Sequence, residues 1–551
     1  MLEQKQDQRN HRVIQSRLWW FGGSILALLL LGCGYLYSKV ILREKSEDLI
    51  ENLSGSSIPS SDSRFLFMAV DLSNAIVVNG LFTGFWLNVN EINTVQREAI
   101  DRAEYFIASE TSFPLAQQPE HRANRIRIGW WVGGGVLVLL LLGLGYLHLR
   151  GVLQEEPEYI IKNVPSLDDP RFPLTVIGLS DASVADGILT GFWSKIDEIQ
   201  TERLKAIGQA KSLVQYETFF MTPGQRANHF AEAVIERAKA GVTIQLLLDD
   251  RGTSDISQEY WQRLRDAGIE VRFFRQFDWQ APLQYNSRTH RKLLLIDGQQ
   301  VLLGGAGVSD DWDGKPKQGD QASWLDFEVR YEGAIVRLLQ GKFLQNWAYV
   351  GGAIDLREEK IFQVQESAGL PLYVTDDTSA LNTSYIRMLF QVSFLAAQQR
   401  IWLGSPYFIP DPNTRRALIR TKERGVDVRI LIMSNATDKP LVHFTSRELY
   451  GDLLKAGIKV FEYQPSMMHA KFMLIDSNWV STGSANFDPR SYFHNDELNI
   501  SSNYPELIEK IDRFFMNALN NSHCLSYEEW QARPWKERLS GQFGLMFKNL
   551  L

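Results

Sequence analysis

Two segments of the chain carry the same reactive residue types at the same spacing. One segment reads T-H-R-K-L-L-L-I-D and the other M-H-A-K-F-M-L-I-D, so both have the form H-x-K, four residues, D. Histidine is a general acid or base near neutral pH and can also attack phosphorus, while lysine binds phosphate as a point charge. The six candidate catalytic residues are His290, Lys292, Asp297, His469, Lys471 and Asp476.

Strand geometry predicts how these residues are arranged. An apolar run follows each lysine, as in a buried strand, and residues i and i+2 of a strand point to the same side. The histidine and lysine of each segment are therefore expected to face the same way. Asp297 and Asp476 lie five residues after their lysines, so we expect them to brace the turn after the strand.

Supporting groups follow both segments. After six further residues the first segment continues as G-G-A-G and the second as G-S-A-N. Ser484 and Asn486 could donate hydrogen bonds to phosphate oxygens as negative charge develops on them. Asp326 and Glu497 lie in strand-like settings further on, and we expect a carboxylate behind each histidine ring to hold its tautomer.

The duplication itself favours catalysis over a structural role for the histidines. One neutral imidazole can attack phosphorus and form a covalent intermediate, while the other, protonated, gives a proton to the leaving alkoxide. Zinc binding fits poorly, because a lysine shares each histidine's face and no cysteine or carboxylate lies at ligand spacing. The lysines supply positive charge, so we expect neither a metal nor a cofactor.

Two apolar runs near the N-terminus are long enough to cross a membrane. Leu18 to Tyr37 and Ile128 to Leu149 contain no Asp, Glu, Lys or Arg, and about 20 apolar helical residues span a bilayer core. A tryptophan pair lies at one edge of each run and a tyrosine near the other, as is typical of membrane interfaces. We predict two transmembrane helices; a cleaved signal peptide is the alternative for the first run.

The front of the chain is duplicated, because residues 11–113 partly repeat residues 121–220. Basic residues precede both apolar runs, which gives both the same preferred orientation, although consecutive spans must alternate. We favour a hairpin in a cell membrane of the bacterial inner-membrane type, with both ends and the catalytic body in the cytoplasm. Residues 40–127 would then lie outside; a weakly structured leftover is the alternative for them.

Alternating helical and strand patterns follow, with helices that end at glycine, as in Ala227 to Gly241, Arg415 to Gly425 and Ser446 to Gly457. These patterns repeat in two parts of the chain and predict an α/β sandwich in each. The predicted organisation comprises residues 1–39 with the first membrane helix (18–38), the copied segment 40–127 without a catalytic motif, the second membrane helix (128–149), a linker (150–172), and halves at 173–350 and 370–551.

The paired H-x-K-x4-D motifs resemble those of the phospholipase D superfamily, and other segments are similar to bacterial cardiolipin synthases. These segments are Y-F-I-P-D, S-N-A-T-D, G-S-A-N-F-D-P-R-S-Y-F-H-N-D-E-L-N and W-Q-A-R-P-W-K-E-R-L, and the likeness covers residues 185–545. The resemblance implies two pseudo-symmetric halves and a phosphatidyltransferase that converts two phosphatidylglycerol molecules to cardiolipin and glycerol. By the same analogy His290 is the nucleophile of a phosphohistidine mechanism, and His469 is the acid and base.

One position departs from the family pattern. The first motif is usually followed by G-G-x-N, but Gly307 stands at the asparagine position. Either Ser309 or the polar loop 310–323 could compensate, or the substrate could lie mainly against the second half. The motifs also leave open hydrolysis by the same site, a nuclease, and a membrane scaffold that has lost catalysis.

The composition of the chain limits the classes of molecule that it is expected to bind. The formal net charge of −7 disfavours a nucleic-acid partner, and membrane phospholipids are the partners that the resemblance implies. Two cysteines, Cys33 and Cys524, are too few for a disulfide framework and do not identify a compartment. The oligomeric state is not predicted.

Overall fold

The computed structural model describes residues 134–143, 145–146, 159–279, 285–315, 320–357, 361–362, 368–378 and 384–549. The predicted first membrane helix and the copied segment 40–127 lie outside these residues. Within the predicted second membrane helix, residues 134–143 and 145–146 are helical and their side chains are mostly exposed. Among the helices in the described ranges, none combines the length and apolar character needed to cross a bilayer. The body belongs to a compact unit, Tyr146–Leu551.

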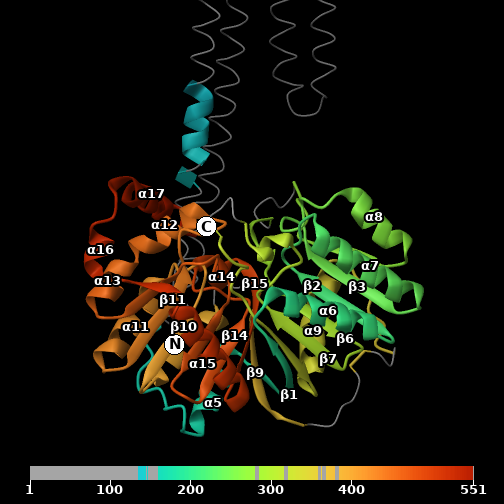
Figure 1. Cartoon of the computed structure of the whole chain (residues 1–551), viewed down its shortest axis with the longest axis horizontal. Helices are drawn as coiled ribbons and strands as arrows, with labels where there is room; N and C mark the ends of the chain where they lie inside the picture. The colour runs from blue at the N-terminus through green and yellow to red at the C-terminus, as the bar shows by residue number, and fades with distance from the viewer. Residues whose placement is uncertain are drawn as a thin grey trace, which may run out of the picture. The chain divides into compact units, whose positions relative to one another are not determined.

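The first half of the body is coloured teal to yellow in Figure 1. Its elements are α5 (Arg171–Ser180), β1 (Ser183–Trp193), α6 (Ile196–Gln209), β2 (Leu213–Thr218), α7 (Gln225–Lys239), β3 (Thr243–Asp249), α8 (Gln258–Asp266), β4 (Glu270–Phe274), β5 (Arg288–Thr289), β6 (Leu293–Ile296), β7 (Gln300–Gly304), the 3-10 helix η2 (Asp310–Asp313), β8 (Glu328–Glu332) and α9 (Ile335–Tyr349).

The second half is coloured orange to red in Figure 1. Its elements are β9 (Leu370–Asp377), α10 (Tyr385–Ala396), β10 (Arg400–Gly404), α11 (Pro412–Glu423), β11 (Asp427–Met433), α12 (Pro440–Glu448), α13 (Tyr450–Lys455), β12 (Lys459–Tyr463), β13 (Phe472–Ile475), β14 (Trp479–Gly483), α14 (Pro489–Phe493), β15 (Asn495–Ser502), α15 (Pro505–Leu519), β16 (Ser522–Leu525), α16 (Tyr527–Gln531) and α17 (Trp535–Met546).

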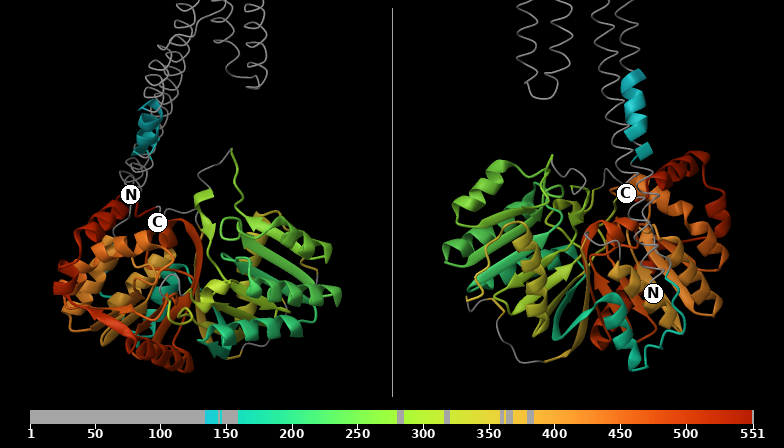
Figure 2. Two further views of the ribbon diagram at one scale, coloured as in Figure 1. Left: turned by 45° about the horizontal axis from the view of Figure 1, so that its top comes forward. Right: turned by 180° about the vertical axis from the view of Figure 1, so that it is seen from behind.

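A single mixed sheet runs through both halves. Its order is β16-β12-β11-β10-β13-β14-β15-β9-β1-β8-β7-β6-β2-β3-β4, with β5 paired to β15 off this path. The two arms mirror each other outward from the central pair β9-β1, since β15-β14-β13-β10-β11-β12 corresponds to β8-β7-β6-β2-β3-β4. In Figures 1 and 2 the two arms diverge from these central strands. The α/β class is confirmed, but the halves share a sheet instead of forming separate sandwiches.

The halves also share a hydrophobic core. Helix α9 of the first half and α15 of the second contribute buried side chains to one cluster with strands of both arms. Phe327 of the first half packs edge-on against Phe514 of α15 in this cluster, with ring centroids 5.2 Å apart. Helix α5 is the first element of the first half in sequence but packs on the second half, where Phe172 meets Trp479 edge-on. The shared sheet and the shared core therefore fix the position of one half relative to the other.

Local differences from the sequence-based expectation occur near the two motifs. Strands β6 and β13 begin at Leu293 and Phe472, one residue after each lysine. The helix expected from Ser446 to Gly457 is instead divided at Leu449 into α12 and α13. The histidine and lysine of each motif thus lie in the extended segments that lead into β6 and β13.

Candidate active site

Each motif histidine is held by the backbone of the opposite half. The short strand β5 pairs in parallel with the start of β15, and the His290 amide donates to the Asp496 carbonyl at 2.9 Å. In the second half, Met468 pairs with Leu325 and the His469 amide donates to the Leu325 carbonyl at 2.8 Å. These hydrogen bonds bring both motifs to the boundary between the halves, although the two motifs lie far apart in sequence.

The His290 ring is oriented through its Nδ1 atom. Nδ1 lies 3.0 Å from the carbonyl oxygen of Ser484 and 3.1 Å from Oε2 of Glu497. Both neighbours accept hydrogen bonds, so Nδ1 carries the proton and Nε2 keeps its lone pair. Burial lowers the pKa of His290 well below its ordinary value, and the charges of Lys292 and Lys471 add to the effect. His290 is therefore a neutral imidazole with an available Nε2.

The His469 ring is oriented in the same way by the first half. Its Nδ1 lies 2.9 Å from Oδ2 of Asp326, and Lys471 Nζ lies 3.0 Å from its Nε2. Burial and the Lys471 charge lower the pKa of His469 to about 4. Although burial opposes it, the hydrogen bond from His469 helps to lower the pKa of Asp326. His469 is thus neutral beside an ionised carboxylate that favours the gain of a proton.

Glu497 is anchored by groups that the sequence analysis did not identify. Ser491 Oγ donates to Oε1 of Glu497 at 2.8 Å, and Asn495 Nδ2 donates to the same oxygen at 3.2 Å. The Ser484 hydroxyl donates to Oε2. Ser491 and Asn495 lie in the stretch N-F-D-P-R-S-Y-F-H-N-D-E that ends at Glu497, yet nothing in their spacing marks them as carboxylate donors. These three hydrogen bonds hold the Glu497 carboxylate in an orientation that brings its Oε2 atom to His290.

Asp326 is anchored by backbone and by an indole. Trp312 Nε1 donates to Oδ2 of Asp326 at 3.2 Å, and the Phe327 amide donates to Oδ1 at 2.9 Å. The Trp312 ring also lies edge-on to the His469 ring, with centroids 5.1 Å apart. Trp312 lies in η2, in the polar loop 310–323. The loop was a candidate from the sequence, but no motif or spacing in it marks Trp312 as a partner of Asp326.

The two lysines lie close to their histidines in a region with little solvent. Lys292 Nζ donates to the His290 carbonyl at 2.7 Å, and Lys471 Nζ donates to the His469 carbonyl at 2.6 Å. Burial lowers the pKa of Lys292 to about 7 and the pKa of Lys471 to about 8, and for Lys292 the charge of Lys471 adds to the effect. The charges of Lys292 and Lys471 repel each other, and a bound anion would relieve that repulsion.

Of the two predicted phosphate donors, Ser484 contacts His290 through its carbonyl oxygen, and Asn486 is the one with a polar atom left unused among the described residues. The Ser484 hydroxyl donates its proton to Glu497, so it cannot donate the same proton to a phosphate. Asn486 is buried, and its Oδ1 has no hydrogen-bond partner within the described ranges. The site therefore contains one unpaired amide oxygen beside the second motif.

Asp297 and Asp476 lie in the turns that end β6 and β13. Asp297 accepts backbone hydrogen bonds from residues 211–213, and Asp476 accepts them from residues 398–400. Both aspartates have positive φ values, 53° and 50°, which Asp and Asn tolerate better than most residues. The two carboxylates tie each motif strand to its neighbouring strand and are not directed toward a histidine by these bonds.

The Gly307 position has no room for an asparagine. A Cβ atom there would lie 2.6 Å from the Phe220 carbonyl oxygen and 3.3 Å from the Trp312 ring. Ser309 does not compensate, because it is fully buried, hydrogen-bonded to Thr222 and capping η2. Phe220 and Trp312 occupy the space instead, so the first half gives the site an aromatic wall where a polar group was expected.

Comparison with known proteins agrees with this geometry. A family profile described as "Cardiolipin synthase, PLD-like domain" matches residues 204–311 and 393–519, and each range contains one motif. A "Cardiolipin synthase" of Geobacillus sp. (strain WCH70) is 30% identical over 408 residues, which cover 72% of this chain and 80% of the relative. "Cardiolipin synthase 2" of Bacillus anthracis is 31% identical over 350 residues, covering 62% and 67%.

The chain belongs to the cardiolipin synthase family. It is an enzyme of the phospholipase D type, a phosphatidyltransferase or phosphodiesterase. The crystal structure of phosphatidylserine synthase from Haemophilus influenzae Rd KW20 aligns with 69% of this chain and 99% of its own, with a TM-score of 0.54 and 13% identity. At that identity the likeness concerns the fold alone. The crossed histidine contacts described above are thus set within a cardiolipin synthase family fold.

Proposed function

We propose that this protein is a membrane phosphatidyltransferase that makes cardiolipin from two phosphatidylglycerol molecules through a phosphohistidine. The observation that carries the proposal is the crossed arrangement, in which each neutral histidine is oriented by a carboxylate of the other half. Two buried lysines beside them supply positive charge for one phosphodiester. The family relatives named cardiolipin synthase support this choice of substrates.

The two histidines differ in a way that supports distinct roles. The pKa of His290 is lowered well below its ordinary value by burial and lysine charges, so it stays an unprotonated nucleophile. His469 contacts Asp326, and burial with Lys471 lowers its pKa only to about 4. A phosphodiester anion beside His469 would counteract this lowering and raise the pKa of His469, because an opposite charge favours the protonated ring. His469 is the better acid and His290 the better nucleophile.

The first step transfers the phosphatidyl group to the enzyme. Nε2 of His290 attacks phosphorus, the bond from phosphorus to the glycerol oxygen breaks, and protonated His469 gives its proton to that oxygen. Glycerol leaves, and His469 becomes a neutral base. Lys292 and Lys471 stabilise the negative charge that gathers on the non-bridging oxygens during the displacement.

The second step transfers the phosphatidyl group to a lipid acceptor. His469 removes the proton from a hydroxyl of a second phosphatidylglycerol, and the resulting oxygen attacks phosphorus. The bond from phosphorus to His290 Nε2 breaks and cardiolipin leaves. Water in place of the lipid hydroxyl would yield phosphatidic acid, so the acceptor alone separates transfer from hydrolysis. An acceptor that resides in a bilayer is consistent with a protein that acts at the cell membrane, with its catalytic body in the cytoplasm.

Product analysis in vesicles tests this proposal. The full-length protein is reconstituted in phosphatidylglycerol vesicles, and cardiolipin, glycerol and phosphatidic acid are measured. We expect cardiolipin and glycerol in equal amounts, no product from His290→Ala or His469→Ala, and unchanged product from His229→Ala, an exposed histidine of α7. Phosphatidic acid without cardiolipin would show a hydrolase, and unchanged product in both active-site variants would show that this site does not act.

The covalent intermediate distinguishes the two histidines. Rapid alkaline quenching of wild type with lipid labelled in the phosphate, which preserves an acid-labile phosphorus–nitrogen bond, should leave label on His290, identified by peptide mapping under alkaline conditions. Label on His469 and none on His290 would reverse the assigned roles. Label on neither residue, with cardiolipin still formed, would remove the covalent step from the proposal.

A further inference from the structure

Helix α17 presents a continuous apolar ridge to solvent. Between 54% and 68% of each ridge residue is exposed, and the four residues are Trp535, Leu539, Phe543 and Met546. At about 100° per helical residue these positions fall within an arc of roughly 80° on one side of the helix. Four large apolar side chains on one exposed helix face are typical of an interaction surface.

The opposite face of α17 is fixed against α12. A Cβ atom at Gly541 would lie 2.6 Å from the Phe444 carbonyl oxygen, and one at Gly544 would lie 1.8 Å from Thr445 Oγ1. The close packing of these glycines leaves no room for the larger ridge residues between the two helices. A salt bridge from Arg447 to Glu537, 2.7 Å long, fixes the same orientation. The ridge therefore cannot turn inward.

Positive charges flank the ridge on both sides. Lys536 and Arg538 are exposed and lie on either side of the apolar arc, whereas the intervening acid, Glu537, is neutralised by its salt bridge with Arg447. This local balance is opposite to the net charge of −7 of the whole chain. An apolar helix face edged by Lys and Arg, with a tryptophan among its residues, suits the interface of an anionic bilayer.

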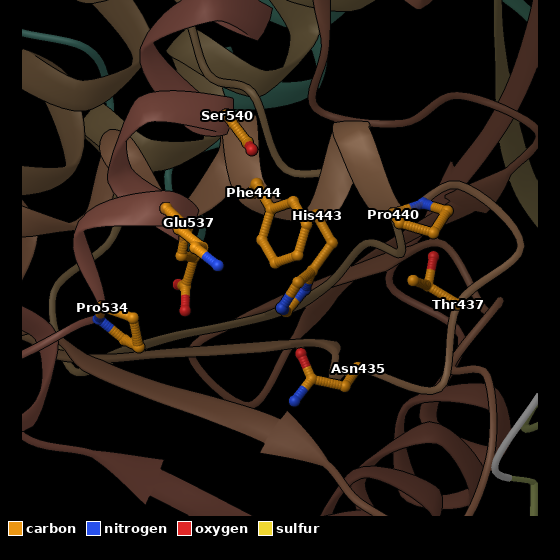
Figure 3. Close-up of a pocket in the computed structure, with 9 residues that line it drawn as sticks. Asn435, Thr437, Pro440, His443, Phe444, Pro534, Glu537 and Ser540 are labelled. Atoms are coloured by element: carbon orange, nitrogen blue, oxygen red, sulfur yellow. The ribbon is translucent and has the colours of Figure 1, made fainter.

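A pocket between α12 and α17, with both apolar and polar lining, favours a lipid over a protein as the occupant of this surface. The pocket, of about 480 Å³, is lined in part by Asn435, Thr437, His443, Lys536, Glu537 and Ser540. Figure 3 shows the His443 ring among these side chains, and neither of its nitrogens has a hydrogen-bond partner within the described ranges. Apolar walls (Pro440, Phe444 and Pro534) together with polar groups suit an amphiphile, whose polar part could meet His443 and Lys536 while its apolar part lies against the walls and the ridge.

We propose that α17 docks the catalytic body on an anionic lipid surface, with the ridge inserted and Lys536 and Arg538 among the head groups. Helix α12 connects this surface to the site: it has nine residues, about 14 Å in length. It begins next to Lys439, whose Nζ lies 4.8 Å from the Tyr407 ring centroid, and Tyr407 belongs to the cluster that includes Trp312. The docking of α17 on lipid does not depend on the proposed reaction. An effect of this docking on lipid turnover does rest on that proposed reaction.

A dye attached to the ridge tests the docking in the full-length protein. In a Cys33→Ser and Cys524→Ser background, Leu539→Cys carries an environment-sensitive dye, and the protein is reconstituted in vesicles of phosphatidylethanolamine and phosphatidylglycerol. Leu174→Cys is the matched control, because Leu174 is 65% exposed on α5, at the end of the body opposite α17 in Figure 1. We expect a blue-shifted emission and quenching by a doxyl-labelled lipid at position 539, and quenching by iodide alone at position 174.

The charge requirement is tested with Lys536→Glu and Arg538→Glu together. The two changes should reduce quenching of the dye at position 539 by doxyl-labelled lipid in anionic vesicles. In vesicles of phosphatidylcholine alone, the parent protein and the charge-reversed variant should both show little quenching by this lipid. Free access of iodide to position 539 would overturn the proposal. Protection from both iodide and doxyl lipid would overturn it too, since a protein, such as a second copy of the chain, would then cover the ridge.

Cardiolipin formation in the same vesicles separates the two proposals. Quenching at position 539 without any cardiolipin from the wild-type protein would count against the proposed reaction and leave the docking intact. Cardiolipin formed with position 539 open to iodide would leave the reaction intact and remove the docking.

Discussion

His290 Nδ1 lies 3.1 Å from Oε2 of Glu497, a residue 207 positions later that belongs to the other half of the chain. His469 has the reciprocal relationship with Asp326, at 2.9 Å. Neither half therefore contains a complete histidine and carboxylate pair. A half produced alone would present a histidine without its orienting acid, and would also lose its share of the common sheet.

The crossed carboxylates should each be required for turnover. Glu497→Gln and Asp326→Asn replace an anionic acceptor with an amide, which no longer favours a proton on Nδ1 or stabilises a charged ring. We expect kcat to fall about 100-fold or more, with little change in KM, because acid and base catalysis contributes on this scale. Cardiolipin formation at several phosphatidylglycerol contents of the vesicle measures both constants.

The two carboxylates should affect different steps. Glu497→Gln should slow formation of the phosphohistidine, whereas Asp326→Asn should also slow its consumption, since the base for the second step is His469. Glu528→Gln, an exposed change on α16, is the control and should behave like wild type. Equal rates in all three variants would remove the orienting role of both carboxylates.

The motif aspartates should stabilise the fold and have little direct part in chemistry. Asp297→Asn keeps a residue that tolerates positive φ but loses an ionised acceptor of backbone bonds, at a cost of about 1–3 kcal/mol. We expect a lower free energy of unfolding at pH 7 and near-normal activity per folded molecule below the melting transition. A large loss of activity in fully folded protein would contradict this assignment.

The effect of Asp297 should depend on pH in a defined direction. Although partial burial opposes it, the backbone donors from residues 211–213 lower the pKa of Asp297. A lowered folded-state pKa contributes stability above the ordinary value of about 3.9 and loses it as pH falls through the folded value. The difference in unfolding free energy between wild type and Asp297→Asn should therefore shrink below about pH 4. A constant difference from pH 7 to pH 3 would show that charge is not the cause.

Restoring the common asparagine at position 307 should harm the protein. The Cβ atom of Gly307→Asn would contact the Phe220 carbonyl and the Trp312 ring, and such crowding costs about 1–3 kcal/mol. Because Trp312 also donates to Asp326, we expect lower activity together with a lower melting temperature. Combining Gly307→Asn with Trp312→Phe, a smaller ring, should recover part of the stability but not the activity. Higher activity in Gly307→Asn would mean that an asparagine donor was missing after all.

Buried neutral His469 should make the fold sensitive to acid. Burial and the Lys471 charge lower its pKa to about 4, whereas an unfolded histidine titrates near 6.5. Between these values the unfolded chain binds more protons, so folding stability falls as pH decreases, by on the order of 3 kcal/mol from this residue. His469→Gln should flatten the dependence of the unfolding midpoint on pH between 6.5 and 4, and exposed His229→Gln should leave it unchanged. An identical pH slope in wild type and His469→Gln would contradict a lowered pKa.

The sequence by itself determined the reactive residues and the α/β elements. Spacing within one strand is a local property, so H-x-K and the downstream aspartate could be assigned roles before any fold was known, and the turn contacts of Asp297 and Asp476 agree with that assignment. Apolar and amphipathic patterns located several helices and strands for the same reason, among them α7, α8, α11, β3, β4, β11 and β12. The predicted membrane helix at 18–38 and the copied segment 40–127 lie outside the described residues and stay predictions.

Tertiary structure alone decided which carboxylate serves which histidine. Glu497 reaches His290 and Asp326 reaches His469 because the halves share one sheet and one core, and no local pattern encodes a pairing across 207 or 143 positions. The aromatic wall at Gly307 and the assignment of the Ser484 hydroxyl to Glu497 arise likewise from packing between distant segments. Side-chain chemistry can be read along a chain, but the direction in which each group points depends on the neighbours that close packing brings to it.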